Sequence, residues 1–259
     1  MNMPWKLYMG TISLEMNRQA RAKGPTYCVS EWAGRFAQAG FDGMELWEYH
    51  ATRCAPEELA ALEAARPPVT VFNSYAELDD SGREGRAVAT ALAQRLGAQG
   101  IKFNVGKDPA ERDVYLASLR DWREQLPEDI LLLCECHPGT IIEEVGEARR
   151  FFDDLGVAGW EIIVHPFNRL ESLRPWFDAF GPAVTLAHLQ MRWEDRTIIR
   201  FDRRPERVRE AVRIMRQAGF SGACTFEFTE GANALGENIE ELWRNTLLDL
   251  AYLKEVMAS

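Results

Sequence analysis

The stretch Ile130–His165, ILLLCECHPGTIIEEVGEARRFFDDLGVAGWEIIVH, contains the unit from which the rest of the chain is built. Its first part, Ile130–Glu135, is short and mostly apolar, as a strand of a buried parallel sheet should be. A helical pattern over Ile142–Leu155 follows, and a second apolar run, Glu161–His165, comes after it. The stretch therefore predicts a strand, a helix and a further strand, which is the repeating unit of α/β proteins.

The same unit recurs on both sides of this stretch. We predict eight strands, at Lys6–Ile12, Gly43–Trp47, Val69–Asn73, Ile101–Val105, Ile130–Glu135, Glu161–His165, Val184–Gln190 and Ala223–Phe228. Eight helical segments alternate with them, at Ser30–Ala39, Pro56–Arg66, Gly82–Leu96, Pro109–Leu126, Ile142–Leu155, Glu171–Phe180, Pro205–Ala218 and Glu237–Met257. The chain contains no low-complexity stretch and no obvious linker between these units.

The spacing of the strand ends separates two candidate folds. Consecutive strand ends, from Thr11 to Glu227, lie 25 to 37 residues apart, and eight such units fit the roughly 250 residues of a (β/α)8 TIM barrel. A doubly wound open sheet is the alternative, but it usually carries a glycine-rich phosphate turn after its first strand. The segment Thr11–Ser13 contains no such turn. We therefore expect a single TIM barrel over residues 1–259.

Composition and charge exclude several classes of partner. The 259 residues include 30 Lys and Arg against 40 Asp and Glu, and the resulting net charge of −10 speaks against a nucleic-acid surface. No apolar run approaches the roughly 18 residues that cross a bilayer, and Met1–Gly10 has no signal-type apolar core. We therefore expect a cytoplasmic protein, in which the five cysteines are buried thiols rather than disulfides.

Polar side chains gather at the carboxyl ends of the predicted strands, where TIM barrels keep their active sites. These residues are Glu45, His50, Asn73, Lys102, Asn104, Glu135, His137, His165, His188, Gln190 and Glu227. They include all four histidines of the chain. An acidic side chain within an apolar strand is costly without a partner, so Glu135 and Glu227 are the strongest candidates for a functional role.

Three segments at these positions resemble signatures of one family. They are GFDGMEL at Gly40–Leu46, LCECHPGT at Leu133–Thr140 and GFSGACTFE at Gly219–Glu227. In this order and at barrel spacing, they are similar to the xylose isomerase-like TIM-barrel superfamily, the sugar phosphate isomerase/epimerase group. That group also includes inosose dehydratases, tagatose-type epimerases and apurinic endonucleases. The resemblance covers nearly the whole chain.

The resemblance implies one divalent metal, held by Glu, Asp, His and Glu from strands five to eight. Glu135 and Glu227 match the two glutamates, but His165 stands where the family commonly has Asp, and Gln190 stands where it commonly has His. His188 lies two residues before Gln190 on the same strand face, and could replace it as a ligand only if the strand shifted. The implied ligands are thus Glu135, His165, Gln190 and Glu227, a donor set suited to manganese, magnesium, cobalt or zinc. A metal-free site is the alternative, and no organic cofactor is expected.

The resemblance also implies proton transfer on a sugar-like, cyclitol or keto-sugar substrate through an enediolate, with Glu135 and Glu227 as the acid and base. Return of the proton gives isomerisation or epimerisation, and loss of a hydroxyl gives dehydration. A degenerate, non-catalytic sugar-binding barrel remains open, while the net charge counts against a DNA-repair endonuclease.

The remaining candidates are assigned to the substrate. Expected substrate contacts are Glu45, Lys102, Asn104, His137, Asn168, His188 and Arg192. We expect a small sugar-like molecule as the partner, with no nucleic acid and no membrane. The sequence leaves open whether the chain forms a homo-oligomer.

Overall fold

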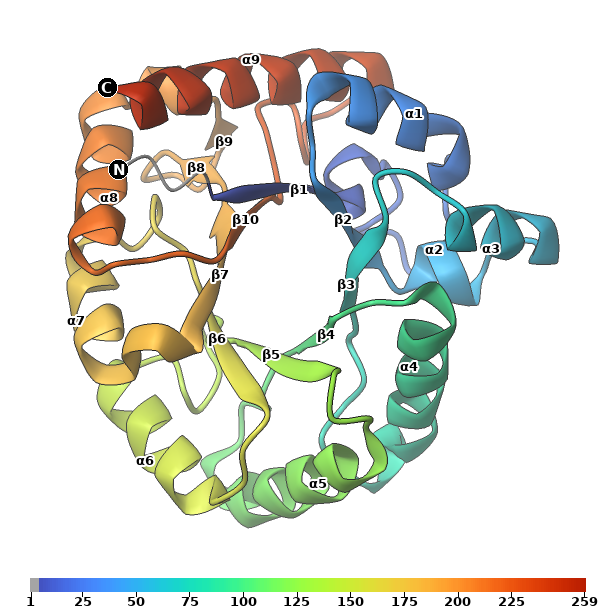
Figure 1. The fold of residues 1–259 in the computed structure, drawn as a ribbon, viewed down its shortest axis with the longest axis vertical. Coiled ribbons are helices and arrows are strands. Elements are labelled where there is room, and N and C mark those ends of the chain that lie inside the picture. Colours follow the sequence, from blue (N-terminus) through green and yellow to red (C-terminus); the bar gives the residue numbers. More distant parts are fainter. Residues whose placement is uncertain (1–4) are drawn as a thin grey trace.

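Eight parallel strands close into a barrel in the computed structural model of the chain, which describes residues 5–259 (Figure 1). Their hydrogen-bonded order is β1-β10-β7-β6-β5-β4-β3-β2. The strands span Lys6–Gly10 (β1), Gly43–Trp47 (β2), Val69–Asn73 (β3), Gly100–Phe103 (β4), Leu131–Glu135 (β5), Trp160–Val164 (β6), Val184–Leu189 (β7) and Ala223–Phe226 (β10). The predicted (β/α)8 barrel is confirmed.

Helices form a ring around the outside of the barrel (Figure 1). They are α1 (Val29–Ala39), α2 (Tyr49–Thr52), α3 (Pro56–Glu63), α4 (Arg83–Leu96), α5 (Arg112–Gln125), α6 (Val145–Leu155), α7 (Leu170–Phe180), α8 (Pro205–Gln217) and α9 (Ile239–Ala258). Local sequence explains several of their ends. Pro56 opens α3, where its missing N–H costs nothing, and Gly40 ends α1 with a φ of 88° that favours glycine. Within residues 5–259, no helix is long and apolar enough to cross a membrane.

The apolar core has two parts, because alternate residues of each strand face the helices or the barrel interior. The larger part packs between the sheet and the helices, and includes Met44 and Cys134. The smaller part fills the interior near the amino ends of the strands. It consists of Tyr8, Val71, Leu133, Ile163, Leu186 and Ala223, called the apolar layer below.

Two glycines make room for the apolar layer. A Cβ atom on Gly43 would lie 2.9 Å from Cδ1 of Tyr8, and one on Gly100 would lie 2.7 Å from Cδ1 of Leu133. Any larger residue at these positions would push the two side chains out of the interior.

Several strands are shorter in the structure than predicted. β1 ends at Gly10 instead of Ile12, because Thr11–Leu14 turns into a short 3-10 helix, and β4 ends at Phe103. As a result Asn104, His165, Gln190 and Glu227 follow their strands by one residue instead of lying within them.

A short antiparallel pair, β8 (Met191–Arg192) with β9 (Ile198–Ile199), was not predicted. Two-residue strands inside a charged loop leave no hydrophobic period to read from the sequence.

Candidate metal centre and active site

A polar layer lies next to the apolar layer, toward the carboxyl ends of the strands. It consists of Glu45, Asn73, Lys102, Glu135, His188 and Thr225, each at most 3% exposed. Leu133 and Glu135 illustrate the change, because they share the inward face of β5 and differ only in which layer they enter. Three further polar residues, His165, Gln190 and Glu227, follow β6, β7 and β10 and are also buried.

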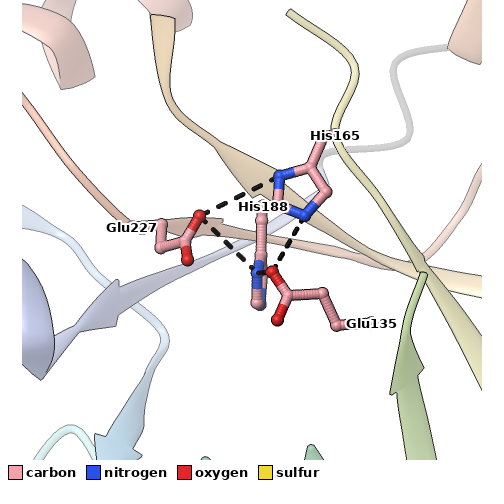
Figure 2. Close-up of side chains that lie close together, drawn as sticks. All are labelled: Glu135, His165, His188 and Glu227. Atoms are coloured by element: carbon pink, nitrogen blue, oxygen red, sulfur yellow. Dashed lines mark hydrogen bonds and ion pairs between the residues drawn. The ribbon is translucent and has the colours of Figure 1, made fainter. Parts of the chain in front are cut away.

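Four of these side chains converge on one point. Glu135, His165, His188 and Glu227 each offer one ligand atom, and all four atoms lie within 4.8 Å of one another. In Figure 2 the two carboxylates flank the two imidazole rings. His165 Nε2 lies 2.9 Å from Glu135 Oε1, and His165 Nδ1 lies 3.9 Å from Glu227 Oε2. Two carboxylate oxygens and two imidazole nitrogens form a donor set that several divalent metals accept.

His188 is fixed in the orientation that a metal ligand needs. Its Nε2 lies 3.0 Å from Oε2 of Glu45, a carboxylate that also accepts hydrogen bonds from Asn73 and Thr225. Its Nδ1 lies 3.4 Å from Glu135 Oε1 and 3.7 Å from Glu227 Oε2, and is buried without a hydrogen-bond partner. A carboxylate behind a ligating imidazole is the usual support for a metal-bound histidine. The unpartnered Nδ1 therefore fits a cation between the two glutamates.

The charges around the cluster are closely coupled. Burial by itself would raise the pKa of Glu135, but the charge of Lys102, a hydrogen bond from His165 and the nearby imidazole of His188 hold it well below its usual range. Burial would lower the pKa of His188, but the carboxylates of Glu45 and Glu227 raise it well above its usual value. In both cases ionised neighbours outweigh desolvation. A divalent cation would take the place of the extra proton on His188.

Lys102 positions Glu135 from the opposite side. Its Nζ lies 2.7 Å from Glu135 Oε2 and donates to Asn104 Oδ1 at 2.6 Å. Asn104 in turn donates to Glu135 Oε2 at 3.0 Å. Burial would lower the pKa of Lys102, but Glu135 and Tyr75 raise it, so the ammonium group stays charged. Glu135 is thus held on one oxygen by Lys102 and Asn104, and presents the other to the histidines.

A cavity of about 760 Å³ opens at the carboxyl ends of the strands. Both Glu135 and Glu227 line it, so a small molecule in the cavity can reach the cluster. Of the expected substrate contacts, Asn104, His137 and Arg192 also line it. Glu45, Lys102 and His188 lie buried in the polar layer, where they contact the two glutamates or each other. Asn168 is not among the lining residues, and its carbonyl oxygen accepts a hydrogen bond from Arg207.

Comparisons with known proteins agree on the architecture. No protein-family model and no curated protein sequence matches the chain. Solved structures do match. A probable 3-DHS dehydratase, AsbF, from Bacillus anthracis is 16% identical, with a TM-score of 0.72 over 96% of this chain and 98% of its own. A D-psicose 3-epimerase, solved in the presence of D-fructose, is also 16% identical, with a TM-score of 0.72 over 98% and 100%.

A third match carries the name of the superfamily. A xylose isomerase-like TIM barrel protein from Mycobacterium smegmatis, in complex with magnesium, is 14% identical, with a TM-score of 0.64 over 98% of both chains. The chain has the xylose isomerase-like TIM-barrel fold. The resemblance read from the three sequence segments is therefore confirmed at the level of the fold.

The structure clarifies the two departures from the pattern of xylose isomerase-like barrels. His165 lies in the four-residue cluster, as expected for a ligand in the place of Asp. Gln190 lies beside the cluster: its Nε2 donates to Glu227 Oε2 at 2.6 Å, and its Oε1 accepts from Nε of Arg192 at 2.8 Å. His188, expected to contact substrate, supplies the fourth donor of the cluster instead. No shift of the strand is required, since β7 pairs His188 with Thr225 in regular register.

Sequence reasoning also missed or misplaced other residues near the site. Arg18 and Tyr75 line the cavity from loops that carry no motif, and only their position in the closed barrel reveals them. His50 is outside the cluster: it lies 2.9 Å from Thr11 Oγ1 and 3.0 Å from Glu15 Oε2, and its ring is 1% exposed. It ties the first loop to the second and does not face the cavity.

Proposed function

We propose that the protein is a divalent-metal-dependent isomerase or epimerase of a sugar-like substrate. The observation that carries this proposal is the convergence of Glu135, His165, His188 and Glu227 at the floor of a cavity of about 760 Å³. These four residues would hold the metal, and Gln190 would orient Glu227 instead of binding the ion. When bound, a divalent cation acts as a Lewis acid toward oxygen atoms of a substrate.

The two glutamates carry the proton transfer in this proposal. Both reach the cavity and approach it from opposite sides of the histidine pair, so each can face a different side of a bound molecule (Figure 2). Glu135 enters the reaction ionised, since Lys102 holds its charge. One glutamate removes a proton from a carbon next to a carbonyl, and the other returns a proton.

The site of proton return decides the product. Delivery to the same carbon from the opposite side gives an epimer, and delivery to the neighbouring carbon gives an isomer. If the second carboxylic acid protonates a leaving hydroxyl instead, the product is a dehydrated compound. Solved structures of the same fold include both an epimerase and a probable dehydratase by name, so one test should detect all three outcomes.

The test is solvent exchange. The protein, first stripped with chelator and then loaded with Mn²⁺, Co²⁺, Mg²⁺ or Zn²⁺, is incubated with keto-sugars in D₂O and followed by NMR. Metal-dependent deuterium incorporation beside the carbonyl is expected with at least one substrate, and should disappear in Glu135→Gln and in Glu227→Gln. Absence of exchange together with absence of metal binding would contradict the proposal and favour a non-catalytic sugar-binding barrel.

A further inference from the structure

One wall of the cavity is built from three neighbouring loops and carries three of the four Lys and Arg side chains in the lining. β7, β10 and β1 are adjacent in the barrel, and the loops that follow them supply Arg192, Phe228 and Arg18 to the cavity. Lys23, from the same loop as Arg18, lines the cavity as well. The loops after β3 and β4 bring three carboxylates to the lining, those of Glu77, Asp79 and Asp108, and one cation, Lys107. The cavity is therefore electrostatically asymmetric.

Arg192 is held rigidly at this wall. Its Nε donates to Gln190 Oε1 at 2.8 Å, and its Nη1 donates to the carbonyl oxygen of Arg196 at 3.0 Å. These two bonds fix the plane of the guanidinium group. Its Nη2 makes no hydrogen bond to any residue in the described part of the chain, 5–259. A planar donor held in this way is suited to binding a carboxylate or a phosphate.

Arg18 is buried at the same wall with one nitrogen unsatisfied. The residue is 3% exposed, and its Nε donates to Asn233 Oδ1 at 3.2 Å, while its Nη2 pairs with the carboxylate of Glu237. Its Nη1 is buried and has no hydrogen-bond partner. Native proteins rarely leave such a donor unpaired, because the lost hydration is not recovered. A ligand oxygen in the cavity would supply the missing acceptor.

We propose that the substrate carries an anionic group, a carboxylate or a phosphate, which Arg192 and Arg18 bind at this wall. The inference rests on the proposed function for the identity of the rest of the molecule, a sugar-like skeleton that reaches Glu135 and Glu227. It adds the orientation: the anionic end lies against the loops after β1, β7 and β10, away from Asp79 and Asp108. Binding at this wall joins the acceptor to two preformed guanidinium groups, so little side-chain ordering is needed.

Three ketoses with one skeleton test the proposal. D-Fructose, D-fructuronate and D-fructose 6-phosphate differ only in a hydroxyl, a carboxylate or a phosphate at carbon 6. Their affinities for the metal-loaded full chain are measured by titration calorimetry at constant ionic strength. At least one of the two anionic sugars is expected to bind at least about tenfold more tightly than D-fructose, and which one does so identifies the anion. Equal affinity for the three sugars, or no binding of either anionic sugar, overturns the proposal.

Substitutions test whether Arg192 and Arg18 cause the preference for an anionic sugar. Arg192→Gln and Arg18→Gln should each remove most of the roughly tenfold preference, measured as the ratio of the affinities for the anionic sugar and for D-fructose. Because Arg18 also ties two loops together, Arg18→Lys is tested beside it and should retain part of the preference. Arg213→Gln, on the exposed side of α8, is the matched control and should retain all of it. Equal loss of affinity for the neutral and anionic sugars in Arg192→Gln would contradict the assignment.

The outcome separates this inference from the proposed function. Anion preference that persists in a protein that exchanges no substrate proton would support the binding wall and refute the isomerase. Proton exchange on neutral ketoses without any anion preference would do the reverse.

Discussion

The interior of this barrel holds two layers that differ in almost every physical respect, although four strands, β3, β5, β7 and β10, contribute to both. The apolar layer contains Tyr8, Val71, Leu133, Ile163, Leu186 and Ala223, and the polar layer contains Glu45, Asn73, Lys102, Glu135, His188 and Thr225. On β3, β5, β7 and β10 the step from one layer to the other is two residues. Position along a strand, rather than burial, therefore decides whether an interior residue serves packing or chemistry.

The comparison also shows how the polar layer is tolerated. Burying a charge is costly unless it is paired and hydrogen-bonded. Each charged group in the layer has such partners: Glu45 accepts three hydrogen bonds, and Lys102 pairs with Glu135. The apolar layer requires none of this. It fills the interior near the amino ends of the strands, on the far side of the polar layer from the cavity.

The largest expected effect separates carboxylates at the two ends of the barrel. Glu135→Gln and Glu227→Gln should each lower kcat by at least about 1000-fold. A neutral amide cannot transfer the proton, and it binds a metal less strongly than a carboxylate does. Glu161→Gln is the matched control. Its carboxyl lies at the apolar end and pairs with Thr185, and burial raises its pKa, so activity should stay near that of the wild type. Activity above a tenth of wild type in either site variant would break the assignment.

The next effect concerns stability. Leu133→Ala should lower the free energy of unfolding by about 3 kcal/mol, because it removes most of a buried side chain from the apolar layer and leaves a cavity. Denaturant unfolding measures this change. The kcat of the folded fraction should change less than threefold, although Leu133 lies only two residues before Glu135. A large fall in kcat would show that the two layers are not independent.

Much of this fold was predictable from sequence because its signal repeats eight times. Short apolar runs such as Val69–Asn73 stand out from amphipathic segments such as Arg83–Leu96, and the spacing between them selects a barrel. Strand ends were less predictable, since one polar residue more or less does not change the pattern. The β8–β9 pair, with two residues in each strand, gave no pattern at all.

The candidate site was predictable only in part, for a related reason. Glu135, His165 and Glu227 stand at strand ends in recognisable segments, and the structure brings them together. The proposed exchange of roles, in which His188 instead of Gln190 binds the metal, depends on which of these two residues faces the cluster. That choice is made by Glu45, from a strand 143 residues away, which holds Nε2 of His188. A partner so far away along the chain cannot be identified from the sequence around His188.

A smaller effect tests that long-range support. Glu45→Gln should weaken metal binding by about 10- to 100-fold, measured by calorimetry with Mn²⁺. Glu45 accepts hydrogen bonds from Asn73, His188 and Thr225, and a glutamine replaces one of its two acceptor oxygens by a donor. The amide N–H then faces either Asn73 or the pair His188 and Thr225, so the support that directs Nδ1 of His188 to the cluster is weakened. Glu63→Gln, which changes an exposed pair with Arg95, should leave the affinity unchanged. Unchanged affinity in Glu45→Gln would remove His188 from the proposed ligand set.

The smallest effect compares Glu135 with a buried carboxylate outside the barrel. Asp249 on α9 accepts hydrogen bonds from the backbone N–H of Phe201 and the hydroxyl of Thr229, both at 2.7 Å, but forms no ion pair within residues 5–259. Burial raises its pKa from 3.8 to about 7, whereas Lys102 keeps the pKa of Glu135 low. The folded state therefore binds the Asp249 proton more tightly than the unfolded state does. The resulting stability is fully present below pH 4 and is lost as pH rises through 7.

Asp249→Asn should remove this pH dependence, because asparagine can accept from Phe201 and donate to the Thr229 hydroxyl without ever becoming charged. Between pH 6 and pH 7 the wild type should lose about 1 kcal/mol of unfolding free energy relative to the variant, measured by denaturant titration at both pH values. Asp153→Asn, at an exposed position on α6, should follow the wild type. If Asp249→Asn also follows the wild type, Asp249 is ionised at pH 6 in the folded protein. Burial with two hydrogen bonds alone would then hold a charge at Asp249, without the ion pair that Lys102 gives Glu135.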